Sequence, residues 1–243
     1  MKYLIIDERM RKIEKDLLES LGYKLISINK SNIVYEEISS HVDIFTCKVG
    51  ENVIIEKSKF ENIRAKLPEE FKSIREGAEF VGESYPDDVK YNVCTIANLA
   101  IHNFKYTDIA IKQNLIKNNY ELINVKQGYT NCSIAVIDER SAITSDKGLY
   151  KALISKNIDT LFLDYIPNIK LYSNGTYSNK NGFIGGAISR IGDNIVVFGD
   201  LSKIDGEHKI RDFIKRRNLN IIDFEDLDVI DYGGIMELDI YIT

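Results

Sequence analysis

The chain has 243 residues, of which 44% are hydrophobic and 28% are charged, and its formal net charge is −5. This balance is typical of a globular protein, and the mildly acidic charge argues against a general nucleic-acid-binding protein, which concentrates positive charge to meet phosphate. No apolar run approaches the ~18 residues that cross a membrane, and the first apolar stretch is too short for a signal peptide, so we expect a cytoplasmic protein without a nucleic-acid or membrane partner.

The first predicted elements are a strand, a helix and a second strand. Residues 3–6 are apolar and β-like, and residues 8–21 carry apolar side chains at the 3.6-residue spacing of a helix. Gly22 stands where a glycine commonly ends a helix, and residues 23–28 form the second strand.

The next segment is less regular. Residues 43–47 and 52–55 predict two strands joined by a tight turn. Residues 60–82 are charged and weakly periodic, and Pro68 interrupts them because the residue before a proline is pushed out of the helical region. We therefore expect a short, irregular helical connection there.

Three later segments share one plan, in which two short strands precede a helix and a closing strand. The predicted elements are 92–97, 99–103, 109–117 and 120–125; then 133–137, 142–144, 147–155 and 160–163; then 182–188, 194–198, 206–217 and 220–224. Residues 232–241 supply two further strands, and joining them to the strand, helix and strand at the start would complete one more unit. Neither end strand would then be left as an unpaired edge.

A degenerate repeat underlies this plan. Segments that begin with His, Tyr or Phe and then become small, apolar or rich in Cys or Gly start at His41, Tyr91, Tyr129, Phe183 and Tyr232. The last four starts are spaced by roughly 40–50 residues, the range of a repeat architecture. We predict a single α/β domain in which five ββαβ units form a ring. The predicted units are residues 232–243 with 1–40, then 41–84, 85–128, 129–181 and 182–231.

Two glycine pairs, Gly185–Gly186 and Gly233–Gly234, lie in inner segments of this repeat, and the runs 126–129 and 143–148 accompany them. Together these features resemble an uncharacterised bacterial branch of the pentein superfamily, whose fold is a five-fold pseudosymmetric α/β propeller. The superfamily includes guanidino-group-modifying enzymes, namely deiminases, dimethylarginine dimethylaminohydrolase and amidinotransferases. It also includes a non-enzymatic ribosome anti-association factor.

The chain departs from the enzymes of that superfamily at one position. The resemblance implies a nucleophilic cysteine soon after the last glycine-rich inner strand, with a histidine base and carboxylates that hold the guanidinium. Here Gly233–Gly234 is followed by Ile, Met, Glu, Leu and Asp, and no cysteine follows. A thiolate attacks an amidine carbon because it is nucleophilic at neutral pH when its pKa is lowered, and none of these side chains replaces it. The sequence therefore leaves open whether the protein is an enzyme.

The three cysteines, Cys47, Cys94 and Cys132, fall at matching places in three predicted inner strands. Their odd number without a close pair fits a reducing compartment, and the absence of CxxC or HxxxH spacing predicts no metal site. Cys132 is the candidate for a displaced nucleophile, and the alternative is that all three are small buried apolar residues. His41, which opens an inner strand, and His102, which ends an outer strand, are the candidate bases.

Four polar residues are the candidates for ligand binding, because each lies in or beside an inner strand: Asp43, Asn92, Asn131 and Asp231. Carboxylates hold a cationic guanidinium or amine by charge-assisted hydrogen bonds. The alternative is that these side chains only satisfy strand ends and turns. No motif predicts a cofactor.

Three functional hypotheses follow. The first is a protein that binds a small cationic or amino-acid-like ligand in a central polar pocket without cysteine hydrolase activity. The second is a cysteine-dependent amidino hydrolase or transferase that uses Cys132. The third is a non-enzymatic protein-interaction module. The sequence leaves the ligand's identity and the oligomeric state open.

Overall fold

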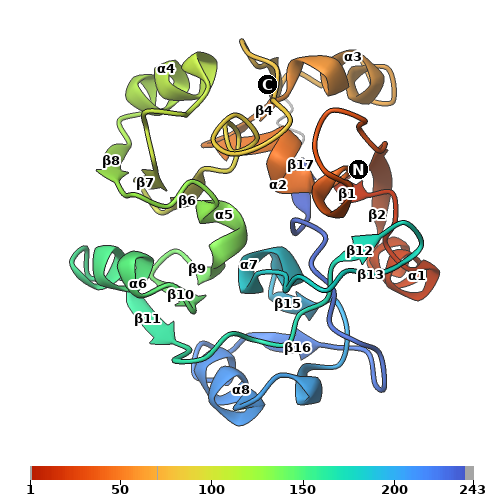
Figure 1. Cartoon of the computed structure of the whole chain (residues 1–243), viewed down its shortest axis with the longest axis vertical. Helices are drawn as coiled ribbons and strands as arrows, with labels where there is room; N and C mark the ends of the chain where they lie inside the picture. Colours follow the sequence, from red (N-terminus) through yellow and green to blue (C-terminus); the bar gives the residue numbers. More distant parts are fainter. Residues whose placement is uncertain (1, 70, 239–243) are drawn as a thin grey trace.

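The computed structural model describes residues 2–69 and 71–238, which form a mixed α/β fold. Within these residues the strands make five three-stranded sheets and one two-stranded hairpin, and each sheet is small and open. Figure 1 shows the longer helices toward the outside of the molecule. These are α1 (Lys12–Ser20), α3 (Lys57–Arg64), α4 (Ile109–Lys117), α6 (Lys147–Ile154) and α8 (Glu207–Lys215).

Four of the sheets share one topology, in which an antiparallel strand pair is followed by a helix and a third, parallel strand. The antiparallel pairs are β3 (Thr46–Val49) with β4 (Asn52–Ile55), β6 (Cys94–Ile96) with β7 (Leu99–His102), β9 (Ile134–Asp138) with β10 (Ser141–Thr144), and β14 (Ile188–Ile191) with β15 (Asn194–Val197). The parallel third strands are β5 (Ile74–Glu76), β8 (Glu121–Asn124), β11 (Asp159–Phe162) and β16 (Asn220–Ile222). This is the ββαβ order that the sequence predicts.

The fifth sheet joins segments from opposite ends of the described chain. Strand β1 (Lys2–Asp7) pairs in parallel with β2 (Tyr23–Ile28) and antiparallel with β17 (Met236–Leu238). Tyr3 lies opposite Leu238 in this register. The predicted pairing of the first strand with the last segment is therefore present, and the part of that segment beyond residue 238 lies outside the described residues.

The inner segments differ from the prediction, because three of them begin as short helices. These are α2 (Val42–Phe45), α5 (Thr130–Ser133) and α7 (Ile184–Ala187), which lead directly into β3, β9 and β14 (Figure 1). All four residues of α2 are buried, as are all four of α7. A segment covered on every side has no alternation of apolar and polar residues, so its sequence does not distinguish a strand from a helical turn. The strands predicted over 43–47 and 133–137 were therefore wrong in their first residues, and the strand predicted over 182–188 was wrong except at Ile188.

The connection predicted to be irregular contains a regular helix. Helix α3 follows β4 almost directly, and the side chain of Glu56 caps it by accepting a hydrogen bond from the Ser58 amide at 2.8 Å. The helix ends before Leu67 and Pro68, as the proline requires, and the chain then forms β5, a strand the sequence did not predict.

Two longer connections run over the same part of the molecule. One contains the 3-10 helix η1 (Glu36–Ile38), and the other contains the hairpin of β12 (Tyr172–Ser173) and β13 (Thr176–Tyr177). They are joined by a hydrogen bond from Ser178 Oγ to Glu37 at 2.9 Å and by an ion pair between Lys180 and Glu37 at 3.0 Å. Neither connection carries a periodic pattern that would have predicted these contacts.

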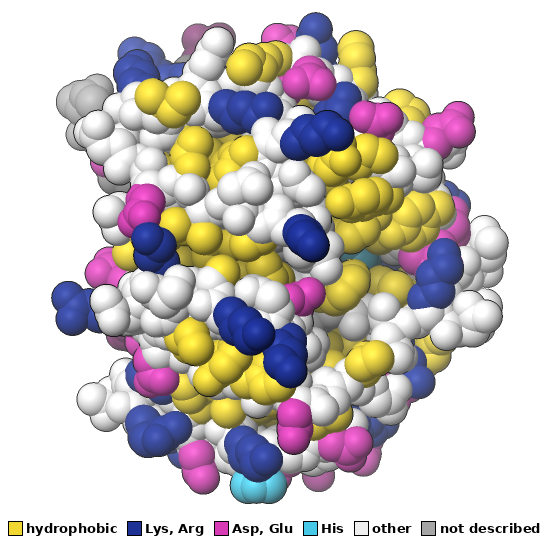
Figure 2. All heavy atoms as spheres, turned by 60° about the vertical axis from the view of Figure 1, so that its left-hand side comes forward, with side chains coloured by type: hydrophobic (Ala, Val, Ile, Leu, Met, Phe, Trp, Pro, Cys, Tyr) yellow, Lys and Arg dark blue, Asp and Glu magenta, His cyan; other side chains and the backbone are white. Residues whose placement is uncertain are grey.

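The core is apolar and lies between the sheets and the helices that cover them. Tyr91 and Tyr232, which open two of the repeated segments, are completely buried. On the face shown in Figure 2, acidic and basic side chains are interspersed with hydrophobic ones. None of the helices in the described ranges has both the length and the apolar character needed to span a membrane.

Candidate functional site

A cavity of about 210 Å³ lies at the N-terminal ends of the three short inner helices. We call it the acidic pocket, because Asp43 and Asp231 lie in its wall together with His41 and Cys132. Its other lining residues are mostly aromatic or aliphatic: Tyr35, Ile38, Ile44, Tyr129, Leu171, Lys180, Asn181 and Phe183. The residues that precede the three helices, His41, Tyr129 and Phe183, also open repeated segments of the sequence, so the repeat brings equivalent positions to one place.

Asp43 is the most unusual group in the pocket. Its side chain is 1% exposed, and neither carboxylate oxygen makes a hydrogen bond with a described residue. Burial raises the pKa of Asp43 to about 6, and the nearby polar groups of Asn92 and Asn131 only partly oppose that rise. A buried carboxylate without a partner costs free energy that a bound cation would recover.

Asp231 is held rigidly beside it. Its two oxygens accept hydrogen bonds from the main-chain amides of Phe183 and Gly233, each at 2.8 Å. Burial raises the pKa of Asp231, and His41 opposes this rise. Among the described residues, no Lys or Arg forms a salt bridge with either Asp43 or Asp231. Lys180 also lines the pocket, but its amine is paired with Glu37 at 3.0 Å, so neither pocket carboxylate has a Lys or Arg ion-pair partner among the described residues.

His41 lies against Asp231, with its Nδ1 atom 3.6 Å from a carboxylate oxygen. Burial lowers the pKa of His41, and the negative charge of Asp231 opposes this effect without reversing it. The imidazole is therefore neutral at pH 7. Its Nε2 atom is buried and has no hydrogen-bond partner among the described residues, so it is available to a ligand.

Asn92 fixes the position of Cys132. Its Oδ1 atom accepts hydrogen bonds from the main-chain amides of Asn131 and Cys132 at 2.8 and 3.3 Å and lies 3.5 Å from the Cys132 thiol. Burial raises the pKa of Cys132 well above its ordinary value, and the negative charges of Asp43 and Asp231 raise it further. The thiol is therefore protonated at neutral pH, which is the unreactive form.

One glycine of each pair lies directly against a pocket carboxylate. A β-carbon at Gly186 would collide with the carboxylate of Asp231. A β-carbon at Gly233 would lie 2.6 Å from Oδ1 of Asp43, and Gly233 also has a positive φ of +69° that L side chains rarely adopt. Both positions are thus restricted to glycine by the site itself.

The structure brings most of the predicted site residues together and separates one. His41, Asp43, Cys132 and Asp231 line the acidic pocket, and Asn92 and Asn131 lie directly behind it. His102 does not lie there, because its two ring nitrogens are used by Thr107 Oγ1 at 2.6 Å and by the Gly128 carbonyl at 2.8 Å. Burial lowers the pKa of His102 to about 4, and both of its nitrogens serve packing rather than a cavity.

The expectation that the three cysteines occupy matching positions was wrong. Cys132 lies in α5, whereas Cys47 and Cys94 lie in β3 and β6 and are buried in hydrophobic clusters. Cys47 lies six residues after His41, whereas Cys94 and Cys132 lie three after Tyr91 and Tyr129, and no short helix directly precedes β6 in the described chain. The described residues contain no group of three or more His, Cys, Asp or Glu side chains placed to hold a metal ion.

The mouth of the pocket was not predicted from the sequence. The rings of Tyr129 and Phe183 are stacked, with their centroids 6.2 Å apart. The hydroxyl groups of Tyr35 and Tyr129 lie 3.3 Å apart. Tyr129 in turn donates to Asp88. Lys180 lies over the Tyr35 ring at 4.7 Å. In the sequence, Tyr129 and Phe183 are distinguished only as the first residues of repeated segments. Tyr35 and Lys180 come from connections that have no periodic pattern of apolar residues.

Comparison with known proteins places the chain in a structural context. A family model described as "Family of unknown function (DUF6873)" matches residues 5–236. None of the curated proteins matches the chain.

Several solved structures are similar over nearly the whole chain. A dimethylarginine dimethylaminohydrolase from Pseudomonas aeruginosa, as a cysteine-to-serine mutant complexed with citrulline, is 10% identical, with 97% of this chain and 98% of that chain covered and a TM-score of 0.54. An agmatine deiminase from C. jejuni is 10% identical, with 97% and 92% covered and a TM-score of 0.52. An amidinotransferase from Microseira wollei is 10% identical, with 94% and 78% covered and a TM-score of 0.53. These proteins are members of the pentein superfamily, and the chain shares their fold.

Proposed function

The chain belongs to the family of unknown function DUF6873 and has the pentein fold, and from this starting point we propose that it binds a small guanidinium or amidinium cation in the acidic pocket. In this proposal the five sheets act as a pseudo-five-fold ring around that ligand. The two carboxylates hold the cation, and the aromatic side chains at the mouth cover it.

The observation that carries the proposal is the buried, unpartnered carboxylate of Asp43 beside Asp231. A guanidinium is planar, carries only donors and matches carboxylate oxygens with pairs of hydrogen bonds. The buried pocket atoms that have no hydrogen-bond partner among the described residues are both oxygens of Asp43 and Nε2 of His41, and a neutral His41 that keeps its proton on Nδ1 presents Nε2 as an acceptor. This donor–acceptor match favours a guanidinium or amidinium over a neutral urea, which presents an acceptor of its own.

The names of two similar structures, though not the citrulline bound in one of them, support the same ligand class. One is named for dimethylarginine and is complexed with citrulline, and another is named for agmatine. At about 10% identity these likenesses establish the fold, so the ligand assignment for this chain rests on its own residues.

We place binding ahead of cysteine chemistry because of the charge around Cys132. The pKa of its thiol is raised by burial and by two carboxylates, and no cysteine follows Gly233–Gly234 in the sequence. One observation favours the alternative, a Cys132-dependent amidino hydrolase or transferase, since Cys132 and His41 line the same cavity. Turnover of a guanidino compound that is lost in Cys132→Ala would establish that alternative.

The test is a thermal-shift and calorimetric titration with agmatine, arginine and citrulline. A ligand that binds only the folded protein raises its unfolding midpoint. We expect agmatine or arginine to raise the midpoint and citrulline, whose ureido group is neutral, to have no effect. Asp43→Asn should abolish the shift, whereas Asp193→Asn, at an exposed turn, should leave it unchanged. Absence of any shift at millimolar guanidino compound would refute the proposal.

A further inference from the structure

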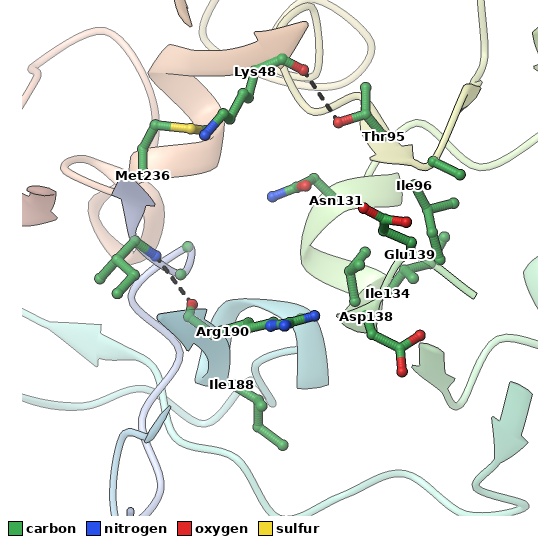
Figure 3. A pocket seen from close by; sticks show the side chains of 17 residues that line it. Lys48, Thr95, Ile96, Asn131, Ile134, Asp138, Glu139, Ile188, Arg190 and Met236 are labelled. Carbon is green, nitrogen blue, oxygen red and sulfur yellow. Dashed lines mark hydrogen bonds between the residues drawn. The ribbon is translucent and has the colours of Figure 1, made fainter. Parts of the chain in front are cut away.

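A second cavity, of about 340 Å³, lies between the inner strands. Every three-stranded sheet contributes to it, through Lys48 of β3, Thr95 of β6, Ile134 of β9, Ile188 of β14 and Met236 of β17 (Figure 3). We call it the inner-strand pocket.

The inner-strand pocket is separated from the acidic pocket by a thin partition. Gly233 and Asn131 line the inner-strand pocket. On the side of the acidic pocket, Gly233 lies so close to Asp43 that an added β-carbon would collide with the carboxylate. The main-chain amide of Asn131 donates a hydrogen bond to Oδ1 of Asn92 at 2.8 Å. The two cavities are therefore distinct, and a ligand in one does not occupy the other.

Arg190 is positioned over this pocket by the main chain. Its Nε atom donates to the Gly192 carbonyl at 2.8 Å and its Nη1 atom to the Ile137 carbonyl at 3.4 Å. Its Nη2 atom makes no hydrogen bond or ion pair with any described residue. Figure 3 shows the guanidinium projecting into the cavity. Two anchored nitrogens reduce the entropy that the side chain would lose on binding a ligand.

The walls below Arg190 are apolar. They are formed by Ile96, Ile134, Val136, Ile188 and Met236, of which the three isoleucines are buried. Two carboxylates also border the cavity. Asp138 is paired with Arg217 at 3.5 Å, which offsets its charge, whereas Glu139 is exposed and makes no ion pair with a described residue.

We infer that the inner-strand pocket binds a small organic carboxylate with a short apolar chain. The carboxylate would accept hydrogen bonds from Arg190, and the chain would lie against the isoleucines. Lys48, whose amine donates to the Glu237 carbonyl at 3.4 Å, adds positive potential on the opposite side of the cavity. Because the residues and the charge of the ligand differ from those of the acidic pocket, this inference stands independently of the proposed function.

The surroundings favour a carboxylate over a phosphate. A single guanidinium matches the two oxygens of a carboxylate, and apolar walls favour an attached alkyl chain. Glu139 repels any anion, and it repels a dianion about twice as strongly as a monoanion by Coulomb's law. Removing the charge of Arg190 and removing the charge of Glu139 should therefore change carboxylate affinity in opposite directions.

The experiment is a titration of the full-length protein with butyrate, followed through methyl NMR signals of labelled isoleucine and methionine. We expect saturable shifts at millimolar butyrate for Ile96, Ile134, Ile188 and Met236. Ile38, which lines the acidic pocket, should not shift. Butyramide, which has a similar shape but no charge, should produce much weaker shifts.

Four variants test the charge dependence. Arg190→Gln should raise the half-saturation concentration about fivefold, the size expected for loss of one charge-assisted contact, and Glu139→Gln should lower it. Arg140→Gln is the matched control, because Arg140 is exposed and does not line this cavity, and its half-saturation should be unchanged. Arg190→Lys, which keeps the charge but loses the planar fork, should fall between the wild type and Arg190→Gln.

Several results would overturn the inference: equal half-saturation in the wild type and Arg190→Gln, equal shifts with butyramide, or shifts confined to Ile38. Tighter binding in Arg190→Gln with weaker binding in Glu139→Gln would show that the pocket selects cations instead. Absence of any saturable shift up to tens of millimolar would show that the cavity does not bind this class. A loss of agmatine binding at the acidic pocket would leave all of these readouts unaffected, so the two proposals fail separately.

Discussion

The carboxylate of Asp43 lies so close to the backbone of Gly233 that a β-carbon at position 233 would be 2.6 Å from its Oδ1 atom. These residues are 190 positions apart in the chain, and the carboxylate fits only because position 233 has no side chain. The acidic pocket and the last inner segment are thus sterically matched, so substitutions at this contact should affect binding and folding together.

Gly233→Ala should abolish binding of agmatine and lower the unfolding midpoint. The added methyl group would displace Asp43, and an L residue at φ +69° is strained by about 1–2 kcal/mol. Gly192→Ala is the matched control, because Gly192 has φ +58° with nothing within 4 Å of the added carbon. Thermal unfolding with and without agmatine measures both effects. Equal destabilisation of the two variants, with binding retained, would contradict the predicted clash.

Asp43→Asn should stabilise the unliganded protein at pH 6 and above. The pKa of Asp43 is raised to about 6 in the folded state, so the folded protein holds this proton more tightly than the unfolded chain does. In the wild type, the free energy of unfolding that this proton contributes is fully present below about pH 4. It is lost as the pH rises through about 6, and the loss amounts to about 3 kcal/mol. Urea unfolding of both proteins between pH 4 and 7 measures the difference, which should grow with pH. A difference that is constant with pH would contradict it.

Agmatine binding should strengthen as the pH rises from 5 to 6 and level off above pH 7. The ligand stays cationic over this range, whereas Asp43 must lose its proton to bind the ligand. Below the pKa of Asp43, the affinity should therefore rise up to about tenfold for each pH unit. Calorimetry across pH 5–8 measures the profile. Asp43→Asn should bind weakly at every pH, and a wild-type profile that is equally flat would exclude this carboxylate from binding.

Cys132 should react slowly with iodoacetamide at pH 7.5, because burial and two carboxylates keep its thiol protonated. Cys132→Ala should change agmatine affinity by no more than about twofold, since the thiol's partner is Asn92 and not the ligand. Mass spectrometry of the alkylated native protein measures the reactivity, with the urea-unfolded protein as the reference for full reaction. Rapid alkylation of Cys132 alone would instead favour a nucleophilic role.

Asn92→Ala should destabilise the protein by about 2–3 kcal/mol. In this buried setting the Cys132 amide would lose the side-chain acceptor Oδ1, and the Asn131 amide would keep only its longer hydrogen bond to the main-chain carbonyl of residue 92. Asn98→Ala, at an exposed turn, should change stability by no more than about 0.5 kcal/mol. Denaturant unfolding of the two variants provides the comparison, and equal stabilities would show that Asn92 is not needed to hold the inner segments.

The repeat in the sequence predicted that several of the pocket residues meet. His41, Cys132 and Asp231 are distant in the chain, but each lies near the start or end of a repeated segment, and the segments converge. Because the units repeat, residues near the ends of different segments come close together in space. His102 lies outside the acidic pocket because it ends an outer strand, where its ring is used by Thr107 and Gly128.

Other features had no counterpart in the sequence. The short helices α2, α5 and α7 are largely or wholly buried, so neither a two-residue nor a 3.6-residue period marks them. The mouth residues Tyr35 and Lys180 come from connections whose conformation depends on contacts with each other. Arg190, which follows the pattern of an ordinary exposed strand residue, becomes distinctive only through the carbonyl groups that anchor it.

The pairing of β1 with β17 has a consequence for how the protein is made. The antiparallel neighbour of strand β1, Met236–Leu238, is synthesised more than 200 residues after β1 itself. At ~5–20 residues per second, the nascent chain waits on the order of ten seconds or more with that strand edge exposed and with Asp43 lacking the Gly233 segment. Contacts of such long sequence separation slow folding. A growing chain therefore cannot complete the wall of the acidic pocket before its last inner segment is made.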